Sequence, residues 1–394
     1  MSRPPLEVAD ILRAAGEAFI ERNRHWLHWK QVKVLRAIQR CRTAALGGHL
    51  DECMRCGHRA PISYNSCRDR HCPKCQTAAR DRWIAARRQE LLPTHYLHVV
   101  FTLPHRLVPL VLQNKKILYG LLFRTSAETL LEVARNSGRL GAEIGFFSVL
   151  HTWSQKLTAH PHVHCVVPAG GLSPDHTRWV RSRDNYFLPK KVLKKVFRGK
   201  FVHALEQAFQ DGQLRFYGDL KLLAYPKIFA AWLRPLYRQD WVVYLKRPFG
   251  GPEYVVHYLG RYTHRVAISN HRLVSFTDGQ VTFRCRDSAH QQKLLTLSLD
   301  EFLQRFLLHI LPKGFVRIRH FGFLANRKRA SLLPLCFHLL GATQQTQAEP
   351  HAAGTKDSPP SLRCPKCGGP MRIIQRFSAA ELQLRSPPTV AAAA

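Results

Sequence analysis

Residues 160–171, with the sequence HPHVHCVVPAGG, decide the fold of this chain. The β-branched run at Val163–Val167 is followed by Pro-Ala-Gly-Gly, which predicts a β-strand that ends in a turn. Alternate side chains of a strand share one face, so His162 and His164 point the same way while Val163 faces the core. Two imidazoles on one face can bind one cation, although histidines can equally satisfy hydrogen bonds inside a core.

Two further strands are predicted around this one. Tyr96–Leu103 and Ile144–Trp153 are rich in β-branched and aromatic residues, and residues 107–137 have the pattern of a helix. The order strand, helix, strand, strand is typical of an α+β fold in which helices flank a central, largely antiparallel sheet. Later in the chain, Asp278-Gly279 between two alternating segments predicts a β-hairpin turn.

Composition divides the chain into three parts. Residues 1–92 combine amphipathic helices with a cysteine-dense segment, and residues 93–335 contain the predicted strands. Residues 336–394 are rich in Ala, Gln, Pro and Ser around one CxxC pair. We therefore predict an N-terminal helical and metal-binding domain, a central α+β domain, and a C-terminal linker and loose tail.

The charge of the chain indicates nucleic acid as its partner. Sixty Lys and Arg against 26 Asp and Glu give a formal net charge of +34, which attracts a polyanion. An acidic membrane surface is the alternative, but the basic residues are spread along the whole chain and not gathered beside an apolar anchor. Since a signal sequence and an apolar stretch of membrane-spanning length are both missing, we expect a cytoplasmic, nucleoid-associated protein with reduced thiols.

The cysteine spacing predicts a structural zinc site. The pair Cys53 and Cys56 is separated by fifteen residues from the pair Cys72 and Cys75, a spacing that suits four thiolates around one Zn²⁺ ion. Four cysteines saturate zinc, although four neighbouring side chains could replace a ligand or build a second site. These are His49, His58, Cys67 and His71.

A third CxxC pair, Cys364 and Cys367, forms a half-site near the C-terminus. Cys336 and His338 are candidate partners. An unfilled or intermolecular half-site is an equal alternative.

A metal ion that assists phosphoryl transfer needs a third protein ligand beside the histidine pair. Gln155 is the preferred candidate, because an amide oxygen suits a hard ion such as Mg²⁺ or Mn²⁺. His160 and His151 are the alternatives, and Pro161 is expected to turn His160 away from the ligand face.

The sequence YLGRY at residues 258–262 supplies two phenols. On a helix, Tyr258 and Tyr262 lie on one face, where both can approach the same phosphate in turn. Aromatic side chains at this spacing also pack against sheets, which is the alternative interpretation. A phenol has a pKa of about 10, so attack at neutral pH requires the metal, Arg261 or Arg265 to favour the phenolate or to stabilise the transition state.

Together these parts favour an enzyme that breaks and rejoins single-stranded DNA. Attack by tyrosine conserves the phosphodiester energy in a protein linkage, and two tyrosines allow two linkages at once, which is strand transfer. Two rival hypotheses are a non-enzymatic, zinc-dependent DNA-binding regulator and a metal-free tyrosine recombinase that links to the 3′-phosphate. A carboxylate-triad transposase is disfavoured because the acidic residues form no clustered motif.

Six motifs occur in order along the chain: CMRCGH, SCRDRHCPKC, FTLPHRL, HPHVHCVVPAGGLS, YLGRYTHRVAISN and KGFVRIRHFGFLANR. Together they resemble the rolling-circle transposases of the insertion sequence ninety-one type, which are HUH endonucleases. The resemblance spans roughly residues 10 to 335, and the presence of both tyrosines matches the two-tyrosine branch.

The resemblance implies an N-terminal zinc-binding DNA-recognition domain and an HUH catalytic domain whose antiparallel sheet carries the histidine pair. It implies metal-assisted nicking of one DNA strand, with a 5′-phosphotyrosine link and a free 3′-OH. On the matching positions, His162 and His164 become metal ligands, and Tyr258 and Tyr262 become nucleophiles. The candidate DNA-contacting cations are Arg261, Arg265, Arg317 and Arg319.

Overall fold

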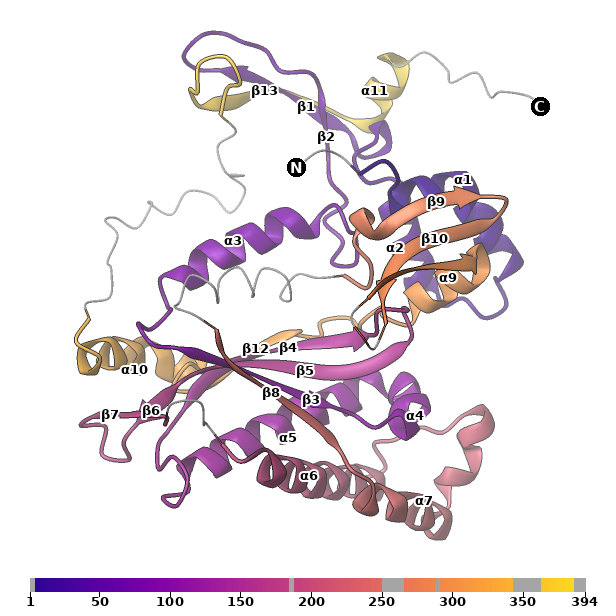
Figure 1. The fold of residues 1–394 in the computed structure, drawn as a ribbon. Helices are drawn as coiled ribbons and strands as arrows, with labels where there is room; N and C mark the ends of the chain where they lie inside the picture. Colours follow the sequence, from indigo (N-terminus) through magenta and orange to yellow (C-terminus); the bar gives the residue numbers. More distant parts are fainter. Residues whose placement is uncertain are drawn as a thin grey trace.

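The computed structural model describes residues 4–183, 188–249, 266–287, 289, 291–342 and 363–385 (Figure 1). The N-terminal part contains α1 (Val8–Arg22), α2 (Trp29–Gln39), β1 (Gly48–Cys53), β2 (Ser63–Tyr64) and α3 (Gln76–Arg88). The central part contains β3 (Tyr96–Thr102), α4 (Val108–Gln113), α5 (Lys115–Arg135), β4 (Gly145–Trp153), β5 (Ala159–Pro168), β6 (Gly170–Leu172), β7 (Trp179–Arg181), α6 (Lys190–Gln210), α7 (Pro226–Arg238) and β8 (Val242–Phe249). The C-terminal part contains β9 (Leu273–Thr277), β10 (Gln280–Arg286), β11 (Gln292–Ser298), α9 (Leu299–Leu307), β12 (Ile318–Gly322), α10 (Asn326–Leu339), β13 (Met371–Phe377) and α11 (Ala379–Arg385).

Five antiparallel strands form the central sheet, in the order β12-β4-β5-β3-β8. The three strands predicted from sequence are β3, β4 and β5, and they are direct neighbours in the middle of this sheet. Helices flank the sheet (Figure 1), so the prediction of an α+β fold with a central antiparallel sheet is confirmed. The edge strands β8 and β12 were not among the predicted strands.

One face of the central sheet is covered by α5 and α6. The strand side chains on this face are apolar and alternate along each strand, as in Val99, Phe101, Leu150, Val163 and Cys165. Phe197 of α6 packs on Phe101 with the ring centroids 4.8 Å apart. Because side chains of a strand alternate between faces, the residues between these positions point to the other side of the sheet.

The other face of the sheet carries His98, His151, His162 and His164, and α3 lies on this side of the sheet (Figure 1). Trp83 of α3 packs edge-on against Phe147 of β4, with the ring centroids 5.7 Å apart. The same small hydrophobic cluster includes Tyr96, Val149 and Val166 from three neighbouring strands. The helix is therefore anchored to the sheet beside the histidines.

The predicted hairpin around Asp278-Gly279 is confirmed. Strands β9 and β10 are antiparallel, and β11 adds a third strand. Asp278 and Gly279 have φ values of 50° and 70°, which suit the two central residues of a type I′ turn. Helices α1, α2 and α9 share a second hydrophobic core with this sheet, in which the buried residues include Phe19, Leu35, Phe283 and Phe302.

The local sequence explains where α9 begins. The hydroxyl of Ser298 accepts a hydrogen bond from the backbone N–H of Glu301 at 3.3 Å, which caps the helix. Asp300 and Glu301 place negative charge at the positive end of the helix. The apolar residues then recur at helical spacing and are buried: Leu299, Phe302, Leu303 and Phe306.

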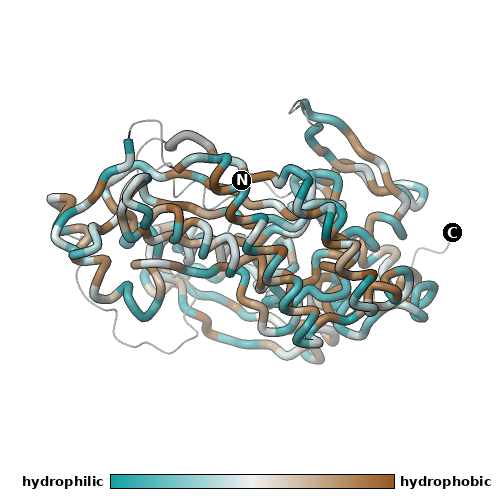
Figure 2. The backbone as a smooth tube through the Cα atoms, turned by 90° about the horizontal axis from the view of Figure 1, so that it is seen from below, coloured by the Kyte–Doolittle hydropathy of each residue, from teal (hydrophilic) through white to brown (hydrophobic). Residues whose placement is uncertain are grey.

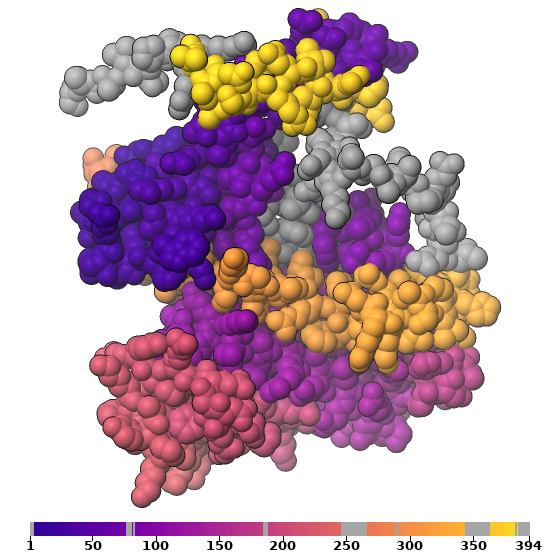
Figure 3. Space-filling model, turned by 180° about the vertical axis from the view of Figure 1, so that it is seen from behind, coloured from indigo at the N-terminus to yellow at the C-terminus, as the bar shows by residue number. Residues whose placement is uncertain are grey.

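The expectation of a loose C-terminal tail is wrong for residues 363–385. Strand β13 pairs with β1 in antiparallel register, from Gly48 opposite Phe377 to Cys53 opposite Met371. Figure 3 shows the C-terminal residues seated on the N-terminal segment near residue 50, on the opposite side of the molecule from α6 and α7. Composition could not reveal this pairing, because the two strands come from opposite ends of the chain.

Hydrophobic residues are distributed in short runs along the chain. Figure 2 shows hydrophobic and hydrophilic segments alternating along the backbone, as expected for elements with one buried side. Among the helices that the structure describes, none combines the length and the apolar character needed to cross a membrane.

The aromatic contact between α6 and the sheet gives a test of the fold. Phe197 is completely buried and its ring also contacts Trp241, 5.3 Å away between centroids. We expect Phe197→Ala to lower the free energy of unfolding by about 3–5 kcal/mol, since truncation leaves a cavity. Tyr217 is 55% exposed, and Tyr217→Ala should change the free energy of unfolding by less than about 0.5 kcal/mol. Denaturant unfolding followed by circular dichroism measures both, and equal losses would contradict the packing described.

Candidate functional site

Three histidines meet on the α3 face of the central sheet. His151 lies on β4, while His162 and His164 lie on β5, and one ring nitrogen of each lies within 4.8 Å of the others. The antiparallel register places His151 directly opposite His162. His151 and His164 are buried and His162 is half-buried. This group, the histidine cluster, has the chemistry to hold one divalent cation, because neutral imidazole nitrogens are common metal ligands.

Hydrogen bonds orient two of these rings. Nδ1 of His162 donates to the carbonyl oxygen of His160 at 2.6 Å, which leaves Nε2 of His162 as its basic nitrogen. Nδ1 of His164 lies 2.7 Å from Nε2 of His98 on β3, and the two rings stack with their centroids 5.0 Å apart. Ligation through Nε2 of His164 requires Nδ1 to donate to His98. Outer partners of this kind commonly fix the orientation of metal-binding imidazoles.

The surroundings of the cluster keep the imidazole of His162 neutral. Burial lowers the pKa of His162 to about 4, so this side chain is uncharged at neutral pH. The ring of Trp153 stacks on His151 with the centroids 4.7 Å apart and covers one side of the cluster. The pairing of β4 with β5 shifts by one residue between His151 and Trp153, and irregularities of this kind often re-aim side chains next to active sites.

Gln155 does not share a strand with the histidine cluster. It is exposed in the turn that joins β4 to β5, beyond the end of β4 at Trp153. Its backbone carbonyl accepts a hydrogen bond from Arg272. The side chain of His160, the other alternative, is also exposed. The prediction of Gln155 is not supported by this geometry, which brings His151, the alternative candidate, to the histidine pair.

Four of the predicted site residues lie outside the described residues. These are Tyr258, Tyr262, Arg261 and Arg265. The described chain stops at Phe249, the last residue of β8, and resumes at Val266.

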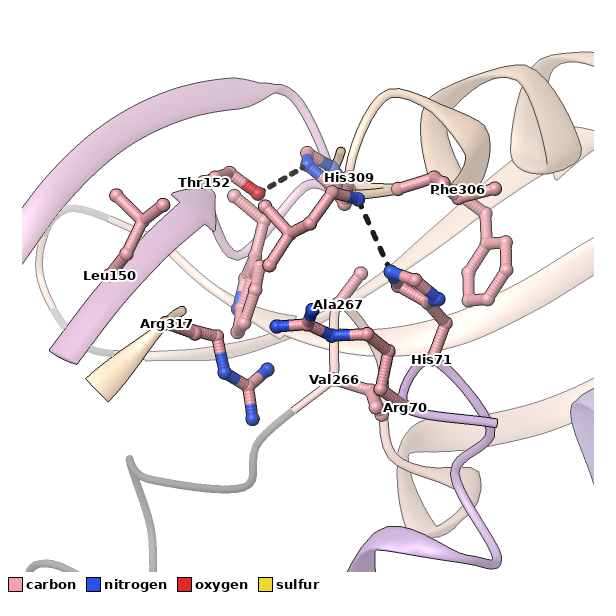
Figure 4. Close-up of a pocket in the computed structure, with 12 residues that line it drawn as sticks. Arg70, His71, Leu150, Thr152, Val266, Ala267, Phe306, His309 and Arg317 are labelled. Atoms are coloured by element: carbon pink, nitrogen blue, oxygen red, sulfur yellow. Dashed lines mark hydrogen bonds between the residues drawn. The ribbon is translucent and has the colours of Figure 1, made fainter. Parts of the chain in front are cut away.

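Arg317 and Arg319 point away from the histidine cluster. The guanidinium of Arg319 lies over the ring of Phe123 in α5, 4.4 Å from the ring centroid, so this side chain belongs to the α5 face of the sheet. Arg317 lines a pocket with Arg70 and His309 (Figure 4), and burial lowers its pKa to about 10. The structure does not bring these two arginines to the cluster.

The same pocket lies where the cysteine-rich segment, residues 53–75, contacts the central domain. Arg70 donates a hydrogen bond to the carbonyl oxygen of Phe315 at 2.9 Å. Nε2 of His71 accepts one from the backbone N–H of Leu311 at 3.2 Å (Figure 4). His71, which the sequence offered as a spare zinc ligand, thus holds the segment against the chain that leads to β12.

Eight cysteines form two separate clusters. Cluster one consists of Cys41, Cys67, Cys72 and Cys75. Cluster two consists of Cys53, Cys56, Cys364 and Cys367. In each cluster the four sulfur atoms lie within 4.8 Å of one another. The structure corrects the predicted four-cysteine site, because its two CxxC pairs belong to different clusters.

Cluster one joins the end of α2 to the start of α3. Cys41 follows α2, and Cys75 directly precedes α3. Hydrogen bonding with Cys67 and Cys72 lowers the pKa of Cys41 to about 7, towards the thiolate form that binds metal. Cys67 is one of the replacement ligands predicted from sequence, whereas Cys41 is not, since a single cysteine distant from any CxxC pair has no spacing signal.

Two protein families match this chain. A family described as putative transposase matches residues 145–331. A family described as transposase zinc-binding domain matches residues 11–103. The first match contains the histidine cluster and the second contains cluster one.

Two relatives match over almost the whole chain. The putative transposase y4qJ of Sinorhizobium fredii is 52% identical over 388 residues, which cover 96% of this chain and 97% of the relative. The transposase for insertion sequence element IS801 of Pseudomonas savastanoi pv. phaseolicola is 32% identical over 395 residues, which cover 92% of this chain and 89% of the relative. No solved structure matches the chain.

The choice of third ligand can be tested by Mn²⁺ binding. We expect His151→Ala to weaken Mn²⁺ binding by more than the roughly 10–100-fold that loss of an outer partner costs, because it removes one of the three ring nitrogens of the cluster. Gln155→Ala serves as the matched control and should bind like the parent protein. Isothermal titration of protein that keeps its structural zinc, and from which weakly bound divalent ions have been dialysed, measures both affinities. A loss on Gln155→Ala with none on His151→Ala would restore the amide as the ligand.

The contact between His98 and His164 gives a second test. His98→Leu removes the acceptor for Nδ1 of His164 and should weaken Mn²⁺ binding by roughly 10–100-fold. His98→Gln can place an amide oxygen near the position of Nε2 and should recover most of that affinity. A purely structural role predicts that thermal stability falls in His98→Leu while the Mn²⁺ affinity of the folded protein is unchanged.

Proposed function

Because this chain belongs to the insertion sequence ninety-one family of transposases, we propose that it nicks and rejoins single-stranded DNA at the ends of its element. Family membership makes it a zinc-binding protein that acts on DNA in transposition. The chemistry of nicking is our proposal, and the histidine cluster is the observation that carries it. Three imidazole nitrogens within 4.8 Å on one sheet face form a donor set of the kind that a metal-assisted nuclease needs.

The proposed ligands of the catalytic cation are His151, His162 and His164. Imidazole nitrogens are common ligands of divalent ions, and we propose Mg²⁺ or Mn²⁺ as the ion held here. When bound, the cation would polarise an oxygen of the scissile phosphate and stabilise charge in the transition state. His98 and the carbonyl of His160 would hold the rings in place.

Tyr258 and Tyr262 are the proposed nucleophiles. The phenol oxygen of one tyrosine attacks the phosphorus, the bond from phosphorus to O3′ breaks, and the phenol proton is lost while O3′ gains one. The products are a 5′-phosphotyrosine ester and a free 3′-OH, so the number of phosphate ester bonds is unchanged. A 3′-OH from another strand end can reverse the step and release the tyrosine. The second tyrosine allows a second strand to be held at the same time.

The described chain stops at one end of the central sheet and resumes at the other. β8 ends at Phe249, which pairs with β3 near Tyr96 at one end of the strands. Ala267 belongs to the hydrophobic cluster that contains Trp153, at the other end of β4. In sequence, Tyr258 and Tyr262 fall between these two described points, which border the two ends of the sheet that carries the histidine cluster.

The charge of the chain supports a polyanionic substrate. A net charge of +34 favours contact with many phosphates and makes binding depend steeply on salt. The nucleophiles must reach an unpaired strand end to exchange it, which is why we propose single-stranded DNA as the substrate.

A non-enzymatic DNA-binding regulator is the first rival hypothesis. It requires His98 and the three imidazoles of the histidine cluster to serve only as core residues. Burying polar rings costs free energy unless each is satisfied, so a core without catalytic demands would favour apolar side chains at these positions. A metal-free tyrosine recombinase, the second rival, would resist EDTA and link to the 3′-phosphate.

Covalent attachment to DNA tests the proposal. The protein should become attached to the 5′ side of a labelled single-stranded oligonucleotide that carries an element end, in the presence of Mg²⁺ or Mn²⁺ and not of EDTA. The double variant Tyr258→Phe with Tyr262→Phe should lose attachment while DNA binding persists, because only the phenol oxygens are removed. Tyr254 lies four residues before Tyr258 and outside the YLGRY motif, so Tyr254→Phe is the matched control and should retain attachment. Denaturing gels and mapping of the modified peptide measure the outcome.

Attachment that survives in the double variant would overturn the assignment of the nucleophiles. Attachment to the 3′ side that resists EDTA would support the metal-free recombinase instead. DNA binding without attachment under any of these conditions would support the regulator.

A further inference from the structure

We propose that Cys53, Cys56, Cys364 and Cys367 bind a second structural zinc ion, which joins the two ends of the chain. The two family matches end at residues 103 and 331, so Cys364 and Cys367 lie outside both matches. The proposal does not depend on the nicking chemistry.

The distances between the sulfur atoms fit a tetrahedral metal site. Sγ of Cys53 lies 3.5 Å from Sγ of Cys367, and Sγ of Cys56 lies 3.6 Å from Sγ of Cys364. A disulfide would need about 2.05 Å. Four sulfurs at about 2.3 Å from one zinc ion are about 3.8 Å apart. The two sulfur–sulfur distances between the CxxC segments are therefore close to those of a zinc-bound site.

The two CxxC segments have the same local geometry, although they lie at opposite ends of the chain. In each, the first cysteine sulfur accepts a hydrogen bond at 3.4 Å from the backbone N–H two residues later, which belongs to Arg55 in one segment and Lys366 in the other. In each, the glycine after the second cysteine, Gly57 or Gly368, has a φ of 69°. Two matching turns that each present two sulfurs are typical of a closed zinc site.

The pairing of β1 with β13 brings the two turns together. Cys53 is the last residue of β1 and stands opposite Met371, the first residue of β13. The backbone N–H of Met54 donates to the carbonyl oxygen of Pro370 at 3.0 Å. A Cβ added at Gly369 would lie 2.8 Å from Cβ of Arg55 and 3.2 Å from Sγ of Cys53. The close approach of the turns therefore leaves space for glycine alone at this position.

Cluster one cannot supply ligands to this site, because it already contains four cysteines of its own. The small sheet of β13, β1 and β2 projects from the rest of the molecule (Figures 1 and 3), and most residues of β13 are partly or fully exposed. A sheet with so little core needs another source of stability, and a structural metal commonly provides it. Cluster two thus keeps β13 on β1.

Zinc content tests the proposal in the full chain. After dialysis against a weak chelator, the parent protein should contain one zinc equivalent more than the double variant Cys364→Ser with Cys367→Ser. The double variant Cys53→Ser with Cys56→Ser should lose the same single equivalent, and the quadruple variant should lose no more than either. Cys336→Ala is the matched control, because Cys336 is buried outside both clusters, and it should keep the parent content. Elemental analysis of purified protein gives these values.

Three results would overturn the proposal. Unchanged zinc content in the Cys364→Ser and Cys367→Ser variant would show that the C-terminal pair is not a ligand. A quadruple variant that loses two equivalents would show that the pairs serve different ions. Recovery of zinc on mixing the two double variants would show that the site forms between two copies, since neither variant can complete an intramolecular site. A failure of DNA attachment in these variants has no bearing on the zinc count, so the two proposals fail separately.

Discussion

The antiparallel register between β4 and β5 is the constraint on which the rest of the site depends. It places His151 directly opposite His162, and the two-residue period of a strand then adds His164 to the same face. A slip of one residue in β5 would turn both of its histidines into the hydrophobic layer of α5 and α6. That layer, which includes Val163 and Cys165, enforces the register because its apolar side chains lose their burial in any other. The core that stabilises the sheet therefore also positions its polar face.

Cluster one is connected to this face of the sheet through α3. Cluster one directly precedes α3, and α3 lies across the histidine face with Trp83 packed on Phe147. Arg70 and His71, within the same cysteine-rich segment, are hydrogen-bonded to the chain before β12. An ion bound by cluster one would therefore fix the start of a helix that packs on the same sheet face as the histidines. The structural ion and the catalytic ion would then have separate ligands on one connected scaffold. Soft thiolates would bind the first ion and imidazoles the second.

Segments from the N-terminal part of the chain pack against segments from its C-terminal part. Helices α1 and α2 share a hydrophobic core with β9, β10, β11 and α9, and β1 pairs with β13. Segments separated by most of the sequence thus form the units that flank the central sheet. The contact of chain ends also explains why composition alone misjudged residues 363–385. A strand with few buried side chains has little apolar pattern, and β13 is held on β1 by backbone pairing and, in our proposal, by the zinc ion of cluster two.

Local periodicity was enough to place part of this protein from sequence. The alternation around Val163 predicted a strand with His162 and His164 on one face, and Asp278-Gly279 predicted its hairpin, because both depend only on neighbouring residues. The sequence also carried the ordered motifs that indicate the transposase family. Tertiary structure alone decided that His151 completes the histidine cluster and that His98 orients it, since pairing of separate strands brings them together. It also decided which cysteines share a cluster. A CxxC pair has the same local form whatever its partner, and only the long-range pairing of β1 with β13 selects Cys364 and Cys367 for Cys53 and Cys56.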